Sequence, residues 1–261
     1  MKEHSKRESE RERERATPTT TEVPPLFVFA RRFARALFFK EGENKRERER
    51  DTHRERREMI DEEIIITSEK KSYAMVCAAN MNRSMAAHCS LREKGLNVSS
   101  FGAGSSVKIP GSTRDDPNVY TFGKASYADV RKDLIRLDEN AYRQKGLIDM
   151  LERNMRVKEK PERWQDNSDE KEFDVVVCFE ERVFDLVLAD MREKNAKGTP
   201  CLVINLDVRD SHEDAVNAAP MALKLCEMIE KCEDWECEID EIIDQFEEEV
   251  GIKPLYSVCY Y

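Results

Sequence analysis

The sequence predicts one α/β domain over residues 72–261, built on a doubly wound parallel sheet with added helices. Short apolar runs alternate along this part of the chain with longer segments of helical periodicity. The runs are apolar on both faces, as strands buried beneath two layers of helices require. Strand, helix and parallel strand in this order are joined by right-handed crossovers, which limits the fold to the doubly wound class.

Four segments have the length and composition of buried strands: 73–77, 97–101, 173–178 and 202–206. Six helices are predicted between and after them, at 84–94, 126–137, 139–154, 180–194, 212–233 and 237–249. Gly95 follows the first helix, where a glycine can take the left-handed conformation that ends it. Residues 101–120 are predicted to be a long loop, whose glycines and prolines shape a wall near the strand ends.

The charge of the chain is unevenly distributed, and it argues against two classes of protein. Charged residues make up 38% of the 261 residues, and the formal net charge is −10. Residues 1–70 contain 18 Lys and Arg against 17 Asp and Glu, so the negative charge lies in the predicted domain. An acidic body argues against direct binding of nucleic acid, which needs clustered cations. No segment is long and apolar enough to predict a membrane span.

Residues 1–71 are predicted to form a charged, disordered extension. Arg-Glu runs occupy 11–15 and 46–50, and this alternation places like charges four residues apart, so its support for a helix is mixed. Segment 26–39, rich in Phe and Arg, is compatible with an amphipathic helix that docks on the body, a partner or a membrane surface. We favour an isolated, partly disordered segment instead.

The segment from Ala74 to Met85 is the most informative in the chain. An apolar run ends in Cys77, Arg83 follows six residues later, and Ser84 opens a predicted helix. This spacing lets the backbone curl around an anion with its N–H groups inward. The helix N-terminus adds donors and partial positive charge. Cysteine and arginine are both frequent here, so the spacing is weak evidence by itself, and the position between strand and helix carries the prediction.

The residue types at this loop predict a phosphatase. The positive field favours the thiolate form of Cys77, which is the nucleophilic form. Arg83 presents a planar fork that matches two phosphate oxygens. We therefore predict that Cys77 attacks phosphorus and that Arg83 binds the phosphate. The other predicted residues of the phosphate loop are Ala78, Ala79, Asn80, Met81, Asn82 and Ser84.

A serine leaving group needs a proton as the P–O bond breaks, and we expect an aspartic acid to supply it. Asp116-Pro117 comes too soon after Cys77, so we reject it as the acid. The loop after the last predicted strand contains Asp207 and Asp210, at the carboxyl edge where ligands bind in such sheets. Either aspartate is within reach. Capping of the following helix is the alternative role for Asp210.

The eight cysteines form no C-x-x-C pair and show no metal-type spacing with the four histidines. They fit the reduced thiols of the cytosol or nucleus. Cys226, Cys232 and Cys237 lie close together on a predicted helical stretch, so a metal site there is a minor alternative. We predict an enzyme without metal or other cofactor.

Short motifs spread over the α/β body match a single family. They are Cys77-x-x-Asn80-x-Asn82-Arg83-Ser84-Met85, Ser100-Phe101-Gly102, Val107-Lys108-Ile109-Pro110-Gly111, Pro117-Asn118-Val119-Tyr120, Met150-Leu151-Glu152-Arg153-Asn154, Pro161-Glu162-Arg163, Glu180-Glu181-Arg182-Val183, Asp207-Val208-Arg209-Asp210-Ser211-His212-Glu213 and Val258-Cys259-Tyr260-Tyr261. The chain resembles the Ssu-type phosphatases of the RNA polymerase II carboxy-terminal domain (CTD). The resemblance covers almost the whole α/β body and none of residues 1–70.

The resemblance implies a sheet like that of the low-molecular-weight tyrosine phosphatases and a metal-free phosphoserine phosphatase. It implies that Cys77 is the nucleophile, Arg83 the phosphate clamp and Asp210 the general acid, with assistance from Asp207. Further residues would shape the peptide groove, namely Lys108, Ile109, Pro110, Tyr142 and Met150.

The resemblance also implies substrate and partners. The family acts on phosphoserine followed by cis-proline, chiefly at the fifth position of the CTD heptad repeat, in transcription termination and mRNA 3′-end processing. The implied partners are the CTD phosphopeptide, a symplekin-like scaffold and cleavage and polyadenylation factors. The implied location is the nucleus, with the cytoplasm as an additional one.

One departure and two alternatives accompany this interpretation. The family usually has serines after the nucleophile, where this chain has Ala78-Ala79. These positions contribute mainly backbone N–H groups, so we expect phosphate binding to survive. A loss of the serine side-chain hydrogen bonds would reduce the rate. A tyrosine phosphatase is one alternative, and it would need a late Asp-Pro loop. A weakly active scaffold of the 3′-end processing complex is the other, and the intact Cys77, Arg83 and Asp210 argue against it.

Overall fold

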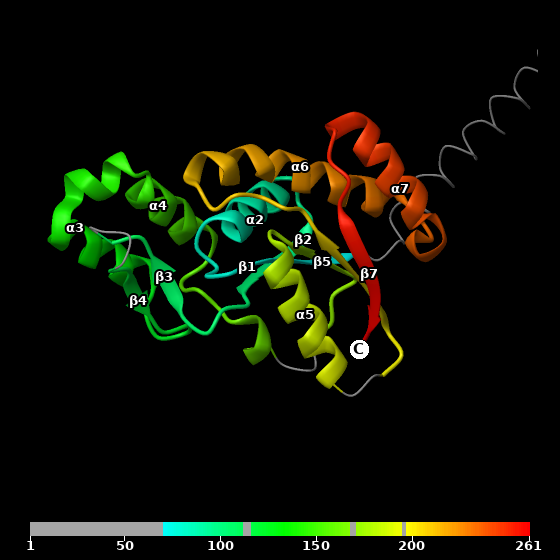
Figure 1. Ribbon diagram of the computed structural model, residues 1–261, viewed down its shortest axis with the longest axis horizontal. Helices are drawn as coiled ribbons and strands as arrows, with labels where there is room; N and C mark the ends of the chain where they lie inside the picture. The colour runs from blue at the N-terminus through cyan, green and yellow to red at the C-terminus, as the bar shows by residue number, and fades with distance from the viewer. Residues whose placement is uncertain (1–69, 112–115, 168–170, 195–196) are drawn as a thin grey trace, which may run out of the picture. The chain divides into compact units, whose positions relative to one another are not determined.

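The computed structural model describes residues 70–111, 116–167, 171–194 and 197–261. The predictions made for the N-terminal extension therefore lie outside the described residues, apart from residues 70 and 71. The chain divides into two units, and the second, residues 69–261, contains every described element (Figure 1).

The second unit is built on a five-stranded sheet with the order β2-β1-β5-β6-β7. The strands are β1 (Ser72–Cys77), β2 (Asn97–Gly102), β5 (Val175–Cys178), β6 (Pro200–Asn205) and β7 (Leu255–Tyr260). The first four are mutually parallel, which confirms the predicted α/β fold and its four strands.

Strand β7 departs from the prediction of a parallel sheet. It pairs antiparallel with β6, with Pro200 opposite Tyr260 and Asn205 opposite Leu255. It forms one edge of the sheet, and its residues are exposed or half-buried rather than buried. An edge strand needs no continuous apolar run, so this strand lacks the pattern by which the four others were found.

Helices cover both faces of the sheet (Figure 1). On one face lie α2 (Arg83–Glu93), α6 (His212–Lys231) and α7 (Trp235–Val250), and on the other lies α5 (Glu181–Glu193). None of the described helices is both long enough and apolar enough to cross a membrane.

Strand β1 shows how the sequence fills both layers, because successive side chains of a strand point to opposite faces. Tyr73 and Met75 are buried in the cluster formed with α6 and α7. Ala74 and Val76 are buried in the other cluster, which includes Trp164 and residues of α5.

A third cluster of buried residues lies beside the sheet. It joins α3 (Tyr127–Gln144), α4 (Leu147–Val157) and a small antiparallel sheet of β3 (Val107–Ile109) and β4 (Asn118–Tyr120) to residues of the loop after β1. The prediction of a long loop over 101–120 missed β3 and β4, which pair there, although residues of this stretch form a wall beside the phosphate loop as predicted. Strands of three residues leave almost no periodicity to detect.

The predicted break between the helices at 126–137 and 139–154 is confirmed as a kink within α3, where Asp138 has a non-helical conformation. The second helix was wrong in its extent, because the chain breaks again at Gly146, before α4. Gly146 has a φ of 71°, and a Cβ there would lie 2.9 Å from the ring of His212. Both conditions favour glycine, and the second depends on a contact distant in sequence.

The sheet topology places the loops that follow β1 and β5 next to each other. From β1 the chain first adds β2 on one side and later adds β5 on the other, so the switch point lies at the carboxyl ends of β1 and β5. Cys77 ends β1 at this point. In open α/β sheets a ligand binds in the crevice at such a point.

His88 of α2 gives the fold a dependence on pH. Its Nδ1 lies 2.8 Å from the Ser100 hydroxyl of β2, and the side chain is buried. Burial, together with Lys158, Arg92 and Lys171, lowers the pKa of His88 to about 4. Folding therefore opposes the protonation of His88. The contribution of His88 to stability is complete above its ordinary pKa and is lost as the pH falls toward 4.

We expect the free energy of unfolding to fall by about 2 kcal/mol between pH 7 and pH 5 through this one group. The variant His88→Gln cannot be protonated and should lose that part of the pH dependence. Denaturant unfolding of both proteins at a series of pH values measures the difference between their free energies of unfolding. The titration of the carboxylates is common to both proteins and cancels in this difference. Equal slopes for the two proteins would contradict the prediction.

Candidate active site

The loop between β1 and α2 begins at Cys77 and ends at Arg83, as predicted. Asn80, near its middle, has a φ of 51°, a left-handed conformation that asparagine tolerates better than most residues. The chain thereby reverses its curvature within the loop, which brings Arg83 back toward the end of the strand.

On one side the loop carbonyls are held by backbone donors. The N–H of Ala103 donates to the carbonyl of Cys77 at 2.9 Å, and the N–H of Gly104 donates to that of Ala78 at 2.9 Å. A Cβ at Gly104 would lie 2.8 Å from this carbonyl oxygen, so the close approach needs glycine.

On the other side, side chains of α3 and α4 hold the carbonyls. Tyr127 donates its hydroxyl to the carbonyl of Asn80 at 2.7 Å. Asn154 donates its amide to that of Met81 at 2.6 Å, and Arg153 donates to the carbonyls of Met81 and Asn82 at 3.3 and 3.1 Å.

These contacts determine where the loop N–H groups point. In a trans peptide the N–H points opposite to the carbonyl, so carbonyls fixed outward turn the following N–H groups inward. Within the described part of the chain, no amide of residues 78–82 donates to a backbone carbonyl. A ring of such donors forms an anion site.

The sulfur of Cys77 is buried in contact with a short chain of polar groups. Asn80 Nδ2 donates to Ser84 Oγ at 3.1 Å, and Ser84 Oγ lies 3.1 Å from Cys77 Sγ. The hydroxyl oxygen already accepts a hydrogen bond, so its own proton is available to the sulfur. The Ser84 hydroxyl can therefore donate a hydrogen bond to the sulfur.

Arg83 lies beneath the loop, with a side chain only 2% exposed. Its Nη1 donates to the carbonyls of Phe179 and Val208 at 3.1 and 2.9 Å. Its Nε is buried and has no partner in the described part of the chain. A buried donor without a partner is costly, and a phosphate oxygen would satisfy it.

Two carboxylates accompany this guanidinium. Arg83 Nη2 lies 2.7 Å from Glu180 Oε2 and 3.5 Å from Asp210 Oδ2. Burial alone lowers the pKa of Arg83, but Cys77, Asp210 and Glu180 outweigh burial and raise it. The arginine is thus held charged in one orientation.

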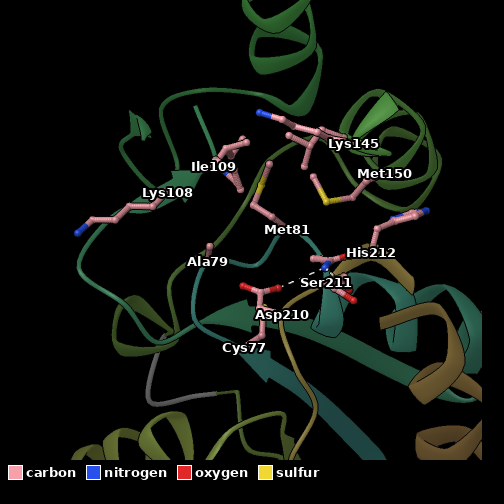
Figure 2. Close-up of a pocket in the computed structure, with 13 residues that line it drawn as sticks. Cys77, Ala79, Met81, Lys108, Ile109, Lys145, Met150, Asp210, Ser211 and His212 are labelled. Atoms are coloured by element: carbon pink, nitrogen blue, oxygen red, sulfur yellow. Dashed lines mark hydrogen bonds between the residues drawn. The ribbon is translucent and has the colours of Figure 1, made fainter. Parts of the chain in front are cut away.

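The two candidate aspartates occupy different positions. Asp210 lies close to Arg83. It accepts a hydrogen bond from Asn82 Nδ2 at 3.2 Å, one of the bonds marked with dashed lines in Figure 2. Its side chain is 58% exposed, so it can reach a bound substrate. Asp207 is exposed and lines neither cavity next to the loop. The helix α6 is capped by Ser211 rather than by Asp210.

A cavity of about 310 Å³ opens in front of Cys77 (Figure 2). Lys108, Ile109, Pro110 and Met150 line it, as the groove prediction expected. Tyr142 does not, because its ring is buried in the third cluster and its hydroxyl is bound by Asn118. The remaining lining residues are Cys77, Ala79, Met81, Asn82, Lys145, Leu147, Asp210, Ser211 and His212.

The described residues contain no candidate metal site. The described ranges contain no group of three or more His, Cys, Asp or Glu arranged to hold a metal ion. Cys226 and Cys232 are buried, whereas Cys237 is exposed.

Several residues with a direct role in this geometry were not predicted: Glu180, Tyr127, Arg153 and Asn154. Asn154 left a signal in the sequence. It continues the apolar stripe formed by Leu147, Met150 and Leu151 on α4 and is itself fully buried. A polar residue in an apolar stripe needs a buried partner. Glu180 left no such signal, since its partner is distant in sequence.

A cysteine and an arginine at the two ends of an amide-lined loop, at the switch point of an α/β sheet, define the class of cysteine-dependent phosphatases. Comparison with known proteins gives the family. The model of the Ssu72-like protein family matches residues 51–261, so the chain belongs to the Ssu72 family. The match includes residues 51–71, which were predicted to belong to the N-terminal extension.

Relatives and solved structures agree with this assignment. The RNA polymerase II C-terminal domain phosphatase ssup-72 of Caenorhabditis elegans is 43% identical over 196 residues, covering 74% of this chain and 98% of the relative. The human C-terminal domain phosphatase SSU72 is 44% identical over 189 residues, covering 72% and 96%. The structure of Drosophila melanogaster Ssu72 with Symplekin, bound to a cis peptidomimetic CTD phospho-Ser5 peptide, has a TM-score of 0.70 at 42% identity, covering 74% and 100%.

The loop geometry predicts an effect of Asn154→Ala. Its amide would no longer hold the carbonyl of Met81, and the buried carbonyl would lose a partner, so we expect a loss of about 1–3 kcal/mol in unfolding free energy. The loop would also have to be ordered on binding, so the Kd for inorganic phosphate should rise by about an order of magnitude. Asn118→Ala removes a hydrogen bond away from the loop and serves as the control. Equal phosphate affinities of both variants and the parent would contradict the prediction.

Proposed function

We propose that the protein is a cysteine-dependent phosphoserine phosphatase of the RNA polymerase II CTD, acting in transcription termination and mRNA 3′-end processing. The observation that carries this proposal is the loop from Cys77 to Arg83, whose carbonyls are fixed outward so that its amides converge on one anion. The relatives named as CTD phosphatases support the choice of substrate.

In the first step the Cys77 thiolate attacks phosphorus opposite the serine oxygen. A phosphorus–sulfur bond forms as the bond to the serine oxygen breaks. The loop amides and Arg83 Nε bind the equatorial oxygens, where charge spreads in the transition state. Asp210, protonated, donates its proton to the leaving serine oxygen.

In the second step Asp210, now a carboxylate, accepts a proton from water as the water attacks phosphorus. The phosphorus–sulfur bond breaks, the electron pair returns to Cys77, and phosphate leaves. Ser84, which contacts the sulfur at 3.1 Å, stabilises the departing thiolate by its hydroxyl proton.

Glu180 has a positioning role in both steps. It holds Arg83 Nη2 at 2.7 Å, while two carbonyls hold Nη1, so the Nε edge faces the loop. Asp210 has only a long contact of 3.5 Å to the same arginine. Glu180 therefore carries the ion pair, and Asp210 is free to serve the leaving group.

The cavity favours a proline after the phosphoserine. Met81, Ile109, Pro110, Leu147 and Met150 give it an apolar wall next to Cys77. A pyrrolidine ring buries its apolar surface there without leaving an N–H unsatisfied. A cis bond turns the chain sharply enough to place both phosphate and ring, and the relative from Drosophila is bound to a cis peptidomimetic.

The relatives also suggest binding partners and a cellular location for this protein. The Drosophila relative is solved with Symplekin, so a symplekin-like scaffold and its cleavage and polyadenylation factors are the proposed partners. An enzyme that acts on RNA polymerase II works in the nucleus.

The two aspartates can be distinguished by their dependence on the leaving group. Asp210→Asn should slow hydrolysis of a phosphoserine peptide by about 10²- to 10⁴-fold, but slow an activated aryl phosphate much less, because an aryl oxide needs little protonation. Asp207→Asn, the matched control, should be close to the parent on both substrates. Equal losses on both substrates would assign Asp210 a structural role, and the reverse pattern would make Asp207 the acid.

Selection of cis-proline predicts two kinetic phases. In unfolded peptides the cis form is a minority of roughly 10–30% that interconverts over tens to hundreds of seconds. At high enzyme concentration a phosphoserine-proline peptide should release phosphate in a fast phase and then a slow one, and added prolyl isomerase should speed the slow phase. Cys77→Ser should show neither phase. A single phase indifferent to isomerase would favour a general phosphatase pocket, and turnover by Cys77→Ser would exclude cysteine chemistry.

A further inference from the structure

A second arginine, Arg153 of α4, contacts the phosphate loop from behind. Its Nη2 donates to the carbonyl of Met81 at 3.3 Å and to that of Asn82 at 3.1 Å. Its Nε and Nη2 also donate to Oδ1 of Asn154, at 3.2 and 3.1 Å. All of these acceptors are neutral oxygens, and the two in the loop are carbonyls, so the guanidinium lies on the side opposite to the loop N–H groups.

The positive charge of Arg153 is not balanced by a carboxylate in the described part of the chain. Arg153 makes no ion pair with a described residue, and its Nη1 is buried without a partner there. Burial lowers the pKa of Arg153, whereas that of Arg83 is raised. Arginine stays protonated in proteins even so. A charge taken from water without a partner costs free energy, and an anion bound nearby would offset this cost.

The charges around Arg83 show what a second cation adds to the site. Glu180 lies 2.7 Å and Asp210 3.5 Å from the guanidinium of Arg83. When both carboxylates are ionised, this group of three has no net positive charge. The attraction of a phosphate with two negative charges then needs another cation. Arg153 is within electrostatic reach, because Cys77 is among the groups that act on its pKa.

The peptide units between Arg153 and the anion site are oriented to transmit its charge. The carbonyl of Met81 shares a peptide unit with the N–H of Asn82, and the carbonyl of Asn82 shares one with the N–H of Arg83. In a trans peptide the two groups point in opposite directions, so the oxygen faces Arg153 and the N–H faces the anion. A hydrogen bond from a charged donor is strong, and it polarises the peptide unit so that its N–H becomes a better donor.

We propose that Arg153 is a positioning residue for phosphate, a second cation that acts on the bound anion through the peptide units after Met81 and Asn82. The proposal rests on the proposed function, because it requires a phosphate on the loop. It assigns to Arg153 a role that depends on charge, whereas Asn154 orients a carbonyl. Loss of the charge should therefore weaken phosphate binding even where the hydrogen bond to Asn154 is kept.

The test compares three variants with the parent, each as the full chain. Arg153→Lys keeps the charge, and Arg153→Gln removes it while keeping an amide donor for Asn154 Oδ1. Arg156→Gln is the control, because Arg156 is exposed on the same helix and its side chain makes no hydrogen bond or ion pair with a described residue. Calorimetry measures the Kd for inorganic phosphate at low and at high salt, and the melting temperature is measured without phosphate.

Arg153→Gln should raise the Kd for phosphate about tenfold, whereas Arg153→Lys should stay within about threefold of the parent. The loss should persist at high salt, because ions screen a buried charge much less than an exposed one. Arg156→Gln should change the Kd by about twofold or less, and only at low salt. Without phosphate, Arg153→Gln should melt no lower than the parent, since an unpaired buried charge has been removed.

Three results would overturn the proposal. They are an unchanged Kd in Arg153→Gln, equal losses in Arg153→Gln and Arg153→Lys, and a loss of affinity in Arg153→Gln that is matched by a fall in its melting temperature. The last two would assign Arg153 a purely structural role. If the parent itself binds no inorganic phosphate, the proposed function fails instead, so the two failures are distinguishable.

Discussion

The outward fixing of the loop carbonyls is the constraint on which the site depends. A ring of converging N–H donors is unfavourable by itself, because each buried donor without a partner costs free energy and the parallel dipoles repel. The protein offsets this cost with backbone donors from Ala103 and Gly104 on one side and with Tyr127 and Asn154 on the other. Phosphate then binds to donors that are already in position, so binding should also stabilise the fold.

The burial of Arg83 follows the same logic. Moving a guanidinium out of water is costly unless its donors are satisfied. Two carbonyls and Glu180 satisfy one end, which leaves the buried Nε for the ligand. The carbonyls belong to Phe179, after β5, and Val208, after β6. The clamp therefore requires three neighbouring strands to end at one edge, and the parallel sheet provides this.

The sequence predicted what local pattern and spacing encode. The buried parallel strands have continuous apolar runs, and Cys77 and Arg83 stand at a spacing that a loop of this kind requires. The edge strand β7 and the short β3–β4 pair escaped prediction, because exposed or three-residue strands have no such pattern. Glu180 escaped because its partner is 97 residues away. Tyr142 was placed in the groove by resemblance, but its ring packs in the third cluster instead.

The third cluster connects phosphate binding with peptide selection. Met150 and Asn154 stand four residues apart on α4, so they share one face of the helix. Met150 lines the apolar cavity, and Asn154 holds the carbonyl of Met81 in the phosphate loop. Any shift of α4 that widens the cavity for a bulkier residue also moves Asn154 away from the loop. A substrate that fits the cavity poorly is therefore bound by a poorly oriented loop, and this coupling turns a modest difference in apolar packing into a difference in the rate of phosphoryl transfer.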